Sequence, residues 1–325
     1  MTNTSTSNKF RRQINKPIEV ILKRNSSFES RHLAHAVVSD NKGRILMYAG
    51  NYDFETFIRS SLKPFQAIPF ITSGTCERYN ITDKGIAITC GSHSGSTFHS
   101  REVFKILWNC HLEVENLKCP IPEGGTSRLQ HNCSGKHAAF LATCKKMEWP
   151  LETYLDKKHP IQSEIIRIVS ELLTIPAEEF ITANDDCGAP VLHLRLSQMA
   201  YLYAKLSSSE SPELEKIKRA IIGNPFLIAG EGKFDTELIS RGHGQIISKG
   251  GSEGIQCICR VREGLGVAIK VEDGSKRAKH AVALQILKQL DWITPTALEE
   301  LSKLSLSFKP GVEIEVQGKL KFQET

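Results

Sequence analysis

The sequence predicts an α/β protein in which both ends of the chain build an antiparallel-sheet lobe and the middle builds a mainly helical lobe. Two observations support this prediction: β-rich segments gather near both ends, and apolar residues at helical spacing dominate between them. Strands separated by a long helical stretch fit a sheet closed by the two termini. We place the α/β lobe at residues 17–95 and 240–325, the helical lobe at 96–239 and a flexible tail at 1–16.

The β-rich segments form two blocks. In the first block, the turn residues Asp40–Gly43 precede the last of three short strands, which predicts an antiparallel meander at residues 18–24, 33–39 and 44–49. The second block predicts strands at residues 244–248, 254–262 and 266–271, followed by a long helix at 275–290. The apolar run at residues 85–89 predicts one more buried strand.

The middle of the chain carries apolar residues at helical spacing. This spacing predicts helices at residues 99–109, 136–148, 161–173, 193–206 and 211–222. Ser211 followed by Pro212 is typical of a helix start, after a serine run that predicts a loop.

Composition excludes several classes of protein. With 40% apolar and 24% charged residues, the chain resembles a globular protein and not a disordered one. The net charge of +6 arises from 42 basic and 36 acidic residues scattered along the chain, so no nucleic-acid surface is indicated. The first 16 residues lack the apolar segment of a signal peptide, and no long apolar run follows. We therefore expect a cytoplasmic protein without membrane segments, whose nine cysteines are reduced thiols.

The first motif with chemical potential is Ser60-x-x-Lys63, in which a lysine amine can reach a serine hydroxyl. The lysine can act as a base only if burial or a nearby cation such as Arg59 lowers its pKa. Pro64 is incompatible with a regular helix through Ser60, so we expect a helix start or an irregular turn. The alternative is a capped helix with a solvated lysine.

The second motif, Cys90–Gly95, is a small-residue turn that offers Ser92 and His93 to a substrate site. Its alternative is a tight loop whose hydroxyls satisfy backbone groups. The third motif, Gln130–His137, opens a helix, and the free amides there favour a carboxylate ligand. Here the alternative is an ordinary N-cap at Ser134 beside a small buried Cys133.

The fourth motif, Asn184–Pro190, is a loop in which Asp185 could hold a substrate ammonium group. Cys187 in the same loop could pair with Cys133 around a metal, although buried unpaired thiols are the alternative. The fifth motif is the apolar strand that ends in Lys270, with Lys249-Gly-Gly-Ser just upstream. A buried lysine is costly unless it is paired or its pKa is lowered, while an outward-facing edge lysine is the alternative.

Taken together, these five segments resemble the Rhizobium-type L-asparaginases, the thermolabile asparaginase II group, from about Glu29 to Gly274. The segments Glu29-Ser30-x-His32 and Lys249–Gly254 add to the resemblance. It implies a fold like those of serine β-lactamases and glutaminases, and a homodimer. One departure is Ser96, which stands where the family pattern has an acidic residue, and this puts substrate-ammonium contacts in that loop in doubt.

The resemblance also implies roles for individual residues. It implies two Ser–Lys tandems, Ser60 with Lys63 and Ser92 with Lys270. It implies zinc near the catalytic serines, and the matching positions are Cys133, Lys136 and Cys187. The expected substrate contacts are Arg59, His93, His137 and Asp185.

The function that these roles imply is hydrolysis of L-asparagine to aspartate and ammonia. Ser60, deprotonated by Lys63, would attack the side-chain amide, and Ser92 with Lys270 would carry a proton to the leaving nitrogen. Two alternatives stay open: a β-lactam-interacting serine hydrolase, because Ser-x-x-Lys and Lys-Gly-Gly-Ser also occur in that class, and a non-catalytic zinc- or thiol-binding protein.

Overall fold

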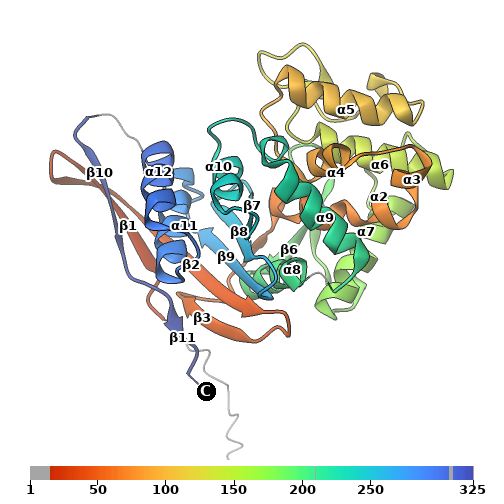
Figure 1. The fold of residues 1–325 in the computed structure, drawn as a ribbon. Helices are drawn as coiled ribbons and strands as arrows, with labels where there is room; N and C mark the ends of the chain where they lie inside the picture. The colour runs from red at the N-terminus through yellow and green to blue at the C-terminus, as the bar shows by residue number, and fades with distance from the viewer. Residues whose placement is uncertain (1–14, 209, 307–309, 325) are drawn as a thin grey trace, which may run out of the picture.

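The computed structural model describes residues 15–208, 210–306 and 310–324. The predicted tail at 1–16 lies outside these residues except for its last two positions. Figure 1 shows a sheet built from the red and blue ends of the chain on one side and a group of helices on the other. The predicted architecture, an antiparallel sheet from both termini with a helical region, is confirmed.

The large sheet joins N-terminal and C-terminal strands in the order β10-β1-β2-β9-β8-β7, and β3 and β11 extend it beside β2. All its pairings are antiparallel, and β2 pairs directly with β9, so the two ends of the chain meet at the centre of the sheet. Its strands are β1 (Ile18–Arg24), β2 (Ser27–Asp40), β3 (Ile45–Ala49), β7 (Ile246–Gly250), β8 (Ile255–Arg260), β9 (Leu265–Val271), β10 (Val312–Gln317) and β11 (Lys321–Phe322).

Helices cover both faces of the sheet. On one face, α10 (Phe234–Arg241), α11 (Lys276–Gln289) and α12 (Pro295–Ser305) bury an apolar cluster that includes Val20, Ile258 and Val282. On the other face lies α8 (Leu196–Ser208). A Cβ at Gly266 of β9 would lie 2.1 Å from the carbonyl oxygen of Ala200, so α8 approaches the sheet closely because this position has no side chain.

The helical part begins much earlier in the chain than residue 96. Residues 59–90 form the 3₁₀ turn η1 and four short helices, and these pack against later helices of the same part. The helices are η1 (Arg59–Leu62), α1 (Lys63–Gln66), α2 (Ile68–Thr72), α3 (Thr75–Arg78), α4 (Asp83–Cys90), α5 (Thr97–Asn109), α6 (Ser134–Met147), α7 (Pro160–Leu173) and α9 (Pro212–Gly223). A small sheet of β4 (Glu55–Phe57), β5 (Thr182–Asn184) and β6 (Pro190–Arg195) lies beside them.

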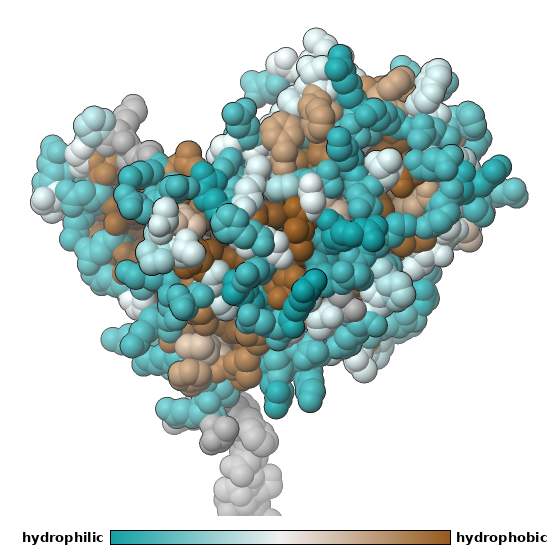
Figure 2. All heavy atoms as spheres, in the orientation of Figure 1, coloured by the Kyte–Doolittle hydropathy of each residue, from teal (hydrophilic) through white to brown (hydrophobic). Residues whose placement is uncertain are grey.

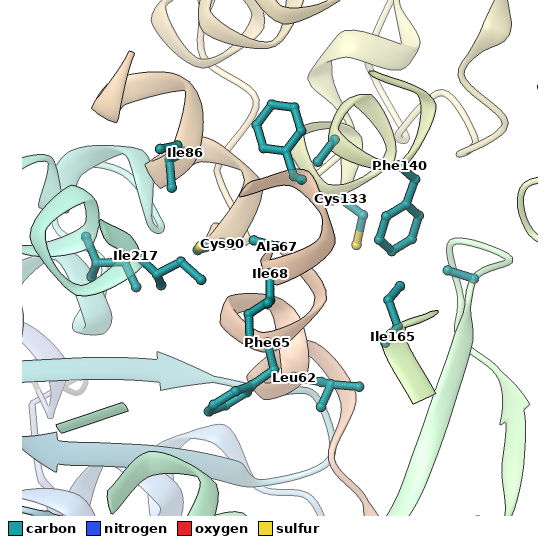
Figure 3. Close-up of a cluster of buried hydrophobic side chains, with 14 of the residues drawn as sticks. Leu62, Phe65, Ala67, Ile68, Ile86, Cys90, Cys133, Phe140, Ile165 and Ile217 are labelled. Carbon is teal, nitrogen blue, oxygen red and sulfur yellow. The ribbon is translucent and has the colours of Figure 1, made fainter. Parts of the chain in front are cut away.

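The core of the helical part forms around the short helices α1 and α2. Figure 3 shows Phe65 and Ile68 with Ile217 on one side and Phe140 and Ile165 on the other. All nine cysteines are buried, and none forms a disulfide. Burial raises the pKa of seven of these thiols to about 12: Cys76, Cys90, Cys110, Cys119, Cys144, Cys257 and Cys259.

One predicted element is wrong: residues 85–89 belong to the helix α4 and not to a strand. The helix is surrounded by other helices, and Ile86, Ala87 and Ile88 are all fully buried. An apolar run that is buried on every side has no amphipathic period, so it cannot be told from a buried strand. In the part of the chain that the structure describes, no helix has the length and apolar character needed to cross a membrane.

Candidate active site

A cavity of about 730 Å³ lies between the sheet and the helical part. From the helical part it is lined by Ser60, Ser92 and Asn132, and from the sheet side by residues 250–254 and 274–277. On the face in Figure 2, hydrophilic residues cover most of both parts, and the outline is notched between them. A cavity of this size is typical of small-molecule sites, so its polar side chains define the candidate site.

The hydroxyl of Ser92 lies between two lysine amines. Lys63 Nζ donates to Ser92 Oγ at 3.0 Å, and Lys249 Nζ donates to it at 2.8 Å. Lys63 Nζ also donates to the carbonyl oxygens of Gly91, at 2.6 Å, and Asn132, at 3.1 Å. Three oxygens around one amine are the partners that an ammonium group requires. Lys63 therefore holds the segment that carries Ser92.

Ser92 reaches the two lysines because the helix α4 ends at Cys90 and the chain is extended at Gly91. A Cβ on Gly91 would lie only 2.4 Å from the carbonyl oxygen of Leu227, so any larger residue would push the segment away. The amide of Ser92 then donates to the carbonyl oxygen of Ile228 at 2.7 Å. These contacts fix the backbone of Ser92 against residues 227–228.

Lys249 is buried next to Ser92 and does not itself line the cavity; it is 1% exposed. Burial lowers its pKa from 10.5 to about 7; Lys63 and Lys279 also lower it, and Asp235 acts in the opposite direction. An amine with this pKa is partly neutral near pH 7 and can accept a proton. The pair of Ser92 and Lys249 is thus equipped for proton transfer.

Ser60 lies in the turn η1, as the prediction of an irregular turn at Pro64 requires. Its side chain lines the cavity, and no hydrogen bond to its hydroxyl occurs among the described residues. The preceding residue, Arg59, has a φ of 52°, in the left-handed region that non-glycine residues seldom adopt. Lys63 points its amine at Ser92 and not at Ser60, contrary to the predicted tandem.

Arg59 and Asp185, two predicted substrate contacts, bind each other. Arg59 Nε donates to Asp185 Oδ1 at 2.8 Å, and Arg59 Nη2 donates to Asp186 Oδ2 at 2.5 Å. This ion pair holds Arg59 in its strained conformation. It also leaves the Asp185 carboxylate engaged, so a substrate ammonium group would have to share it.

Lys270 does not join Ser92, and this predicted pairing is wrong. Its Nζ donates to the carbonyl oxygens of Glu253, at 2.5 Å, and Val271, at 2.8 Å. Lys270 lies on β9 opposite His35 of β2, in the interior of the sheet. Lys249, on the edge strand β7, takes the place beside Ser92.

The sequence does not single out Lys249 as the partner of Ser92, although the segment Lys249-Gly250-Gly251 belongs to the fifth motif. The family resemblance implies Lys270, which ends an apolar strand, as the partner of Ser92. Which face of a strand a lysine occupies depends on pairing register, which a single sequence does not reveal.

His93 and His137 are buried and do not line the cavity. His93 Nε2 pairs with Ser134 Oγ at 3.0 Å, and its Nδ1 accepts from the amide of Gly95 at 3.2 Å. His137 Nδ1 pairs with the hydroxyl of Tyr154 at 2.7 Å. Burial lowers the pKa of both histidines well below 6.5, so they are neutral. Both histidines are bonded within the protein and lie behind the cavity lining, so their predicted role as substrate contacts stays a prediction.

Cys133, Lys136 and Cys187 form a buried group beside the site. The sulfur of Cys133 donates to Asn132 Oδ1 at 3.0 Å, and the neighbouring Cys187, against the effect of burial, holds the pKa of Cys133 well below its usual 9.0. Burial alone would lower the pKa of Lys136, but the two sulfurs, Cys187 first, outweigh it and raise this pKa. The group therefore combines two buried sulfur atoms and a lysine side chain.

This donor set fits a zinc ion in its chemistry, since zinc binds thiolate sulfur and nitrogen. Only two of its side chains are of the types that usually hold metals. Among the described residues, no group of three or more His, Cys, Asp or Glu side chains is arranged as a metal site.

Comparison with known proteins gives weak structural likenesses. The chain is similar to a β-lactamase from Mycobacterium bovis, with 10% identity, TM-score 0.41, and coverage of 84% of this chain and 95% of that one. It is similar to a putative β-lactamase from Bacteroides dorei, with 10% identity, TM-score 0.37, and coverage of 90% and 94%. It is also similar to Mglu in its native form, with 11% identity, TM-score 0.39, and coverage of 79% and 61%. No curated protein sequence matches the chain.

A family model gives the stronger result. The model for L-asparaginase II matches residues 20–322, which is nearly the whole described chain. The match includes the cavity and every polar side chain described around it. The chain therefore belongs to the L-asparaginase II family, a family of amidohydrolases.

Proposed function

We propose that this protein hydrolyses L-asparagine to aspartate and ammonia in the cavity that holds Ser60 and Ser92. The observation that carries the proposal is the placement of Ser92 Oγ within 3.0 Å of two lysine amines, Lys63 and Lys249. A hydroxyl held between two amines, of which one titrates near pH 7, suits the transfer of protons during amide cleavage.

Ser60 is our candidate nucleophile. Ser60 lines the cavity, and its hydroxyl has no hydrogen-bond partner among the described residues, whereas Ser92 Oγ already accepts hydrogen bonds from two amines. Ser60 Oγ attacks the side-chain amide carbon of asparagine, and its proton moves through Ser92 to the neutral amine of Lys249. Lys63 keeps Ser92 in place through its three hydrogen bonds.

The leaving nitrogen then receives the proton from Ser92, the carbon–nitrogen bond breaks and ammonia departs. The remaining β-aspartyl ester on Ser60 is attacked by water, which gives one proton to Lys249. That proton returns to Ser60 as the ester bond breaks and aspartate leaves. Ser92 recovers its proton from Lys249 as ammonia leaves, so Lys249 takes up and releases one proton in each half of the reaction.

We further propose that Cys133, Lys136 and Cys187 hold zinc. The ion would supply a fixed positive charge that attracts the carboxylate of the substrate. Lys136 must lose its proton to bind a metal, and the two sulfurs must be thiolates, so affinity for zinc should fall as pH falls. The ion pair of Arg59 with Asp185 lies next to this group and would orient the polar end of the substrate.

The test is ammonia release from L-asparagine, L-glutamine and D-asparagine, with a chromogenic β-lactam as a counter-substrate. We expect release from L-asparagine and no hydrolysis of the β-lactam. Activity confined to L-glutamine would keep the chemistry and change the substrate, and activity on the β-lactam alone would contradict the proposal. In acid-quenched reactions, intact mass followed by peptide mapping should find the aspartyl ester on Ser60; an ester on Ser92 would reverse the roles of the two serines.

A further inference from the structure

We propose that Asp235 and Lys279 are positioning residues that act on Lys249 from the opposite face of β7 and together set the pH range in which the Ser92 group works. The inference rests on the proposed function of this group. It concerns two charged residues that line the same cavity and form no hydrogen bond with Ser60 or Ser92 among the described residues.

Asp235 of α10 accepts hydrogen bonds from the strand residues on both sides of Lys249. Its Oδ1 accepts from Ser248 Oγ at 2.7 Å, and its Oδ2 accepts from the amide of Gly250 at 2.8 Å. Gln256 Nε2 on β8 also donates to Oδ1, at 2.8 Å. Because side chains alternate along a strand, Ser248 and Gly250 face α10 and Lys249 faces the other way, toward Ser92. The carboxylate thus fixes the backbone from which Lys249 reaches the site.

Lys279 of α11 approaches the same stretch of strand. Its Nζ donates to the carbonyl oxygen of Gly251 at 3.0 Å. A Cβ on Gly250 would lie 3.1 Å from Lys279 Nζ and 3.2 Å from Asp235 Oδ2. The missing side chain at Gly250 is therefore what lets both charges lie against the strand directly behind Lys249.

The two charges have opposite effects on Lys249. Asp235 favours its protonated form, and Lys279 and Lys63 favour the neutral form. Other titratable groups also face this region: the neutral thiols Cys90 and Cys257, the neutral ring of His280, and Cys133. Asp235 and Lys279 are both buried, so solvent screens their charges little.

A purely structural role would give a different result from this one. Loss of packing lowers the rate at every pH, whereas loss of one charge moves the midpoint of the pH profile. Removing Asp235 should move the midpoint down and removing Lys279 should move it up, each by about one pH unit at the dielectric of a protein interior. Midpoint shifts of opposite sign in the two variants therefore distinguish an effect of charge from a loss of packing.

The experiment labels the active-site serine with phenylmethylsulfonyl fluoride and follows the adduct by intact mass between pH 5 and pH 10. Serine oxygen forms a bond to sulfur, fluoride leaves, and the hydroxyl proton passes to Lys249, so the rate reports the neutral amine without asparagine. The variants are Asp235→Asn, Lys279→Met and the double variant. Lys288→Met is the matched control, because Lys288 is an exposed lysine on the same helix.

We expect a downward shift for Asp235→Asn, an upward shift for Lys279→Met, and a midpoint near that of the wild type for the double variant and the control. Shifts of the same sign, or none, would overturn the proposal. If circular dichroism shows that Asp235→Asn does not fold, the variants Lys279→Met and Gly250→Ala replace it in the test. The midpoint of Lys279→Met must still rise. If the midpoints shift as expected but no ammonia is released from asparagine, this inference stands and the proposed substrate is wrong. If the reagent never labels the wild type, both the inference and the proposed function are wrong.

Discussion

Lys249 Nζ lies 2.8 Å from Ser92 Oγ, and these two residues are 157 positions apart in the chain. One comes from the edge strand of the large sheet and the other from the segment that follows α4 in the helical part. The candidate proton-transfer group therefore exists only while the two parts of the molecule are packed together.

Replacement of Lys249 by Met should abolish most of the activity. A positioned acid–base group typically contributes about 10²–10⁴-fold to the rate, so we expect a loss of kcat in that range. The measurement is steady-state ammonia release. Lys270→Met is the matched control, because Lys270 is also a buried sheet lysine but bonds only to backbone carbonyls. An equal loss in both variants would show that buried lysines matter here only for folding.

The same substitution should stabilise the fold at acidic and neutral pH. The pKa of Lys249 in the folded protein is about 7 and its usual value is 10.5, so between these values the unfolded chain binds the extra proton. The wild type therefore gains stability as pH rises through this window, and the penalty is full below about pH 7. We expect Lys249→Met to be more stable by about 1–3 kcal/mol at pH 6, with the difference shrinking toward pH 10. Urea unfolding at the two pH values measures this, and a pH-independent difference would contradict the assignment.

Replacement of Gly91 by Ala should damage the site through the backbone. The added Cβ would lie 2.4 Å from the carbonyl oxygen of Leu227 and would displace Ser92 from the two lysines. We expect at least a tenfold loss of kcat and a lower Tm, since small displacements at an active site are costly. Gly223→Ala is the control, because nothing lies within 4 Å of a Cβ at that position. Wild-type kcat in Gly91→Ala would show that the position of Ser92 is not critical.

Replacement of Cys133 by Ala should raise the KM for asparagine more than it lowers kcat, if zinc positions the substrate. Metal analysis of the purified protein should find about one zinc per chain in the wild type and less in the variant. Cys119→Ala is the control, because Cys119 is a nearby buried thiol with no proposed ligand role. An unchanged KM with abolished kcat would assign the group to the chemistry and not to binding.

The sequence predicted the architecture because patterning is strong in this chain. The strands of the large sheet up to residue 271 and the helix at 275–290 fall close to their predicted bounds, except that β2 begins at Ser27 and not at residue 33. Residues 85–89 were mistaken for a strand because α4 is buried on every side. The C-terminal elements α12, β10 and β11 were not predicted.

The site was predicted less completely for a different reason. Ser60, Lys63 and Ser92 could be found because their motifs are local. Lys249 could not be chosen over Lys270, since the choice depends on which face of which strand each occupies. The homodimer and the cytoplasmic location stay predictions.

The buried cysteines give the protein an internal reporter of opening. At neutral pH the seven thiols with a pKa of about 12 are shielded both by burial and by protonation, so an alkylating reagent cannot modify them in the closed molecule. Each excursion that exposes one of them converts it to a reactive group with an ordinary pKa. Because these thiols are spread over the sheet and the helical part, the order in which they are alkylated would reveal which part of the protein opens first.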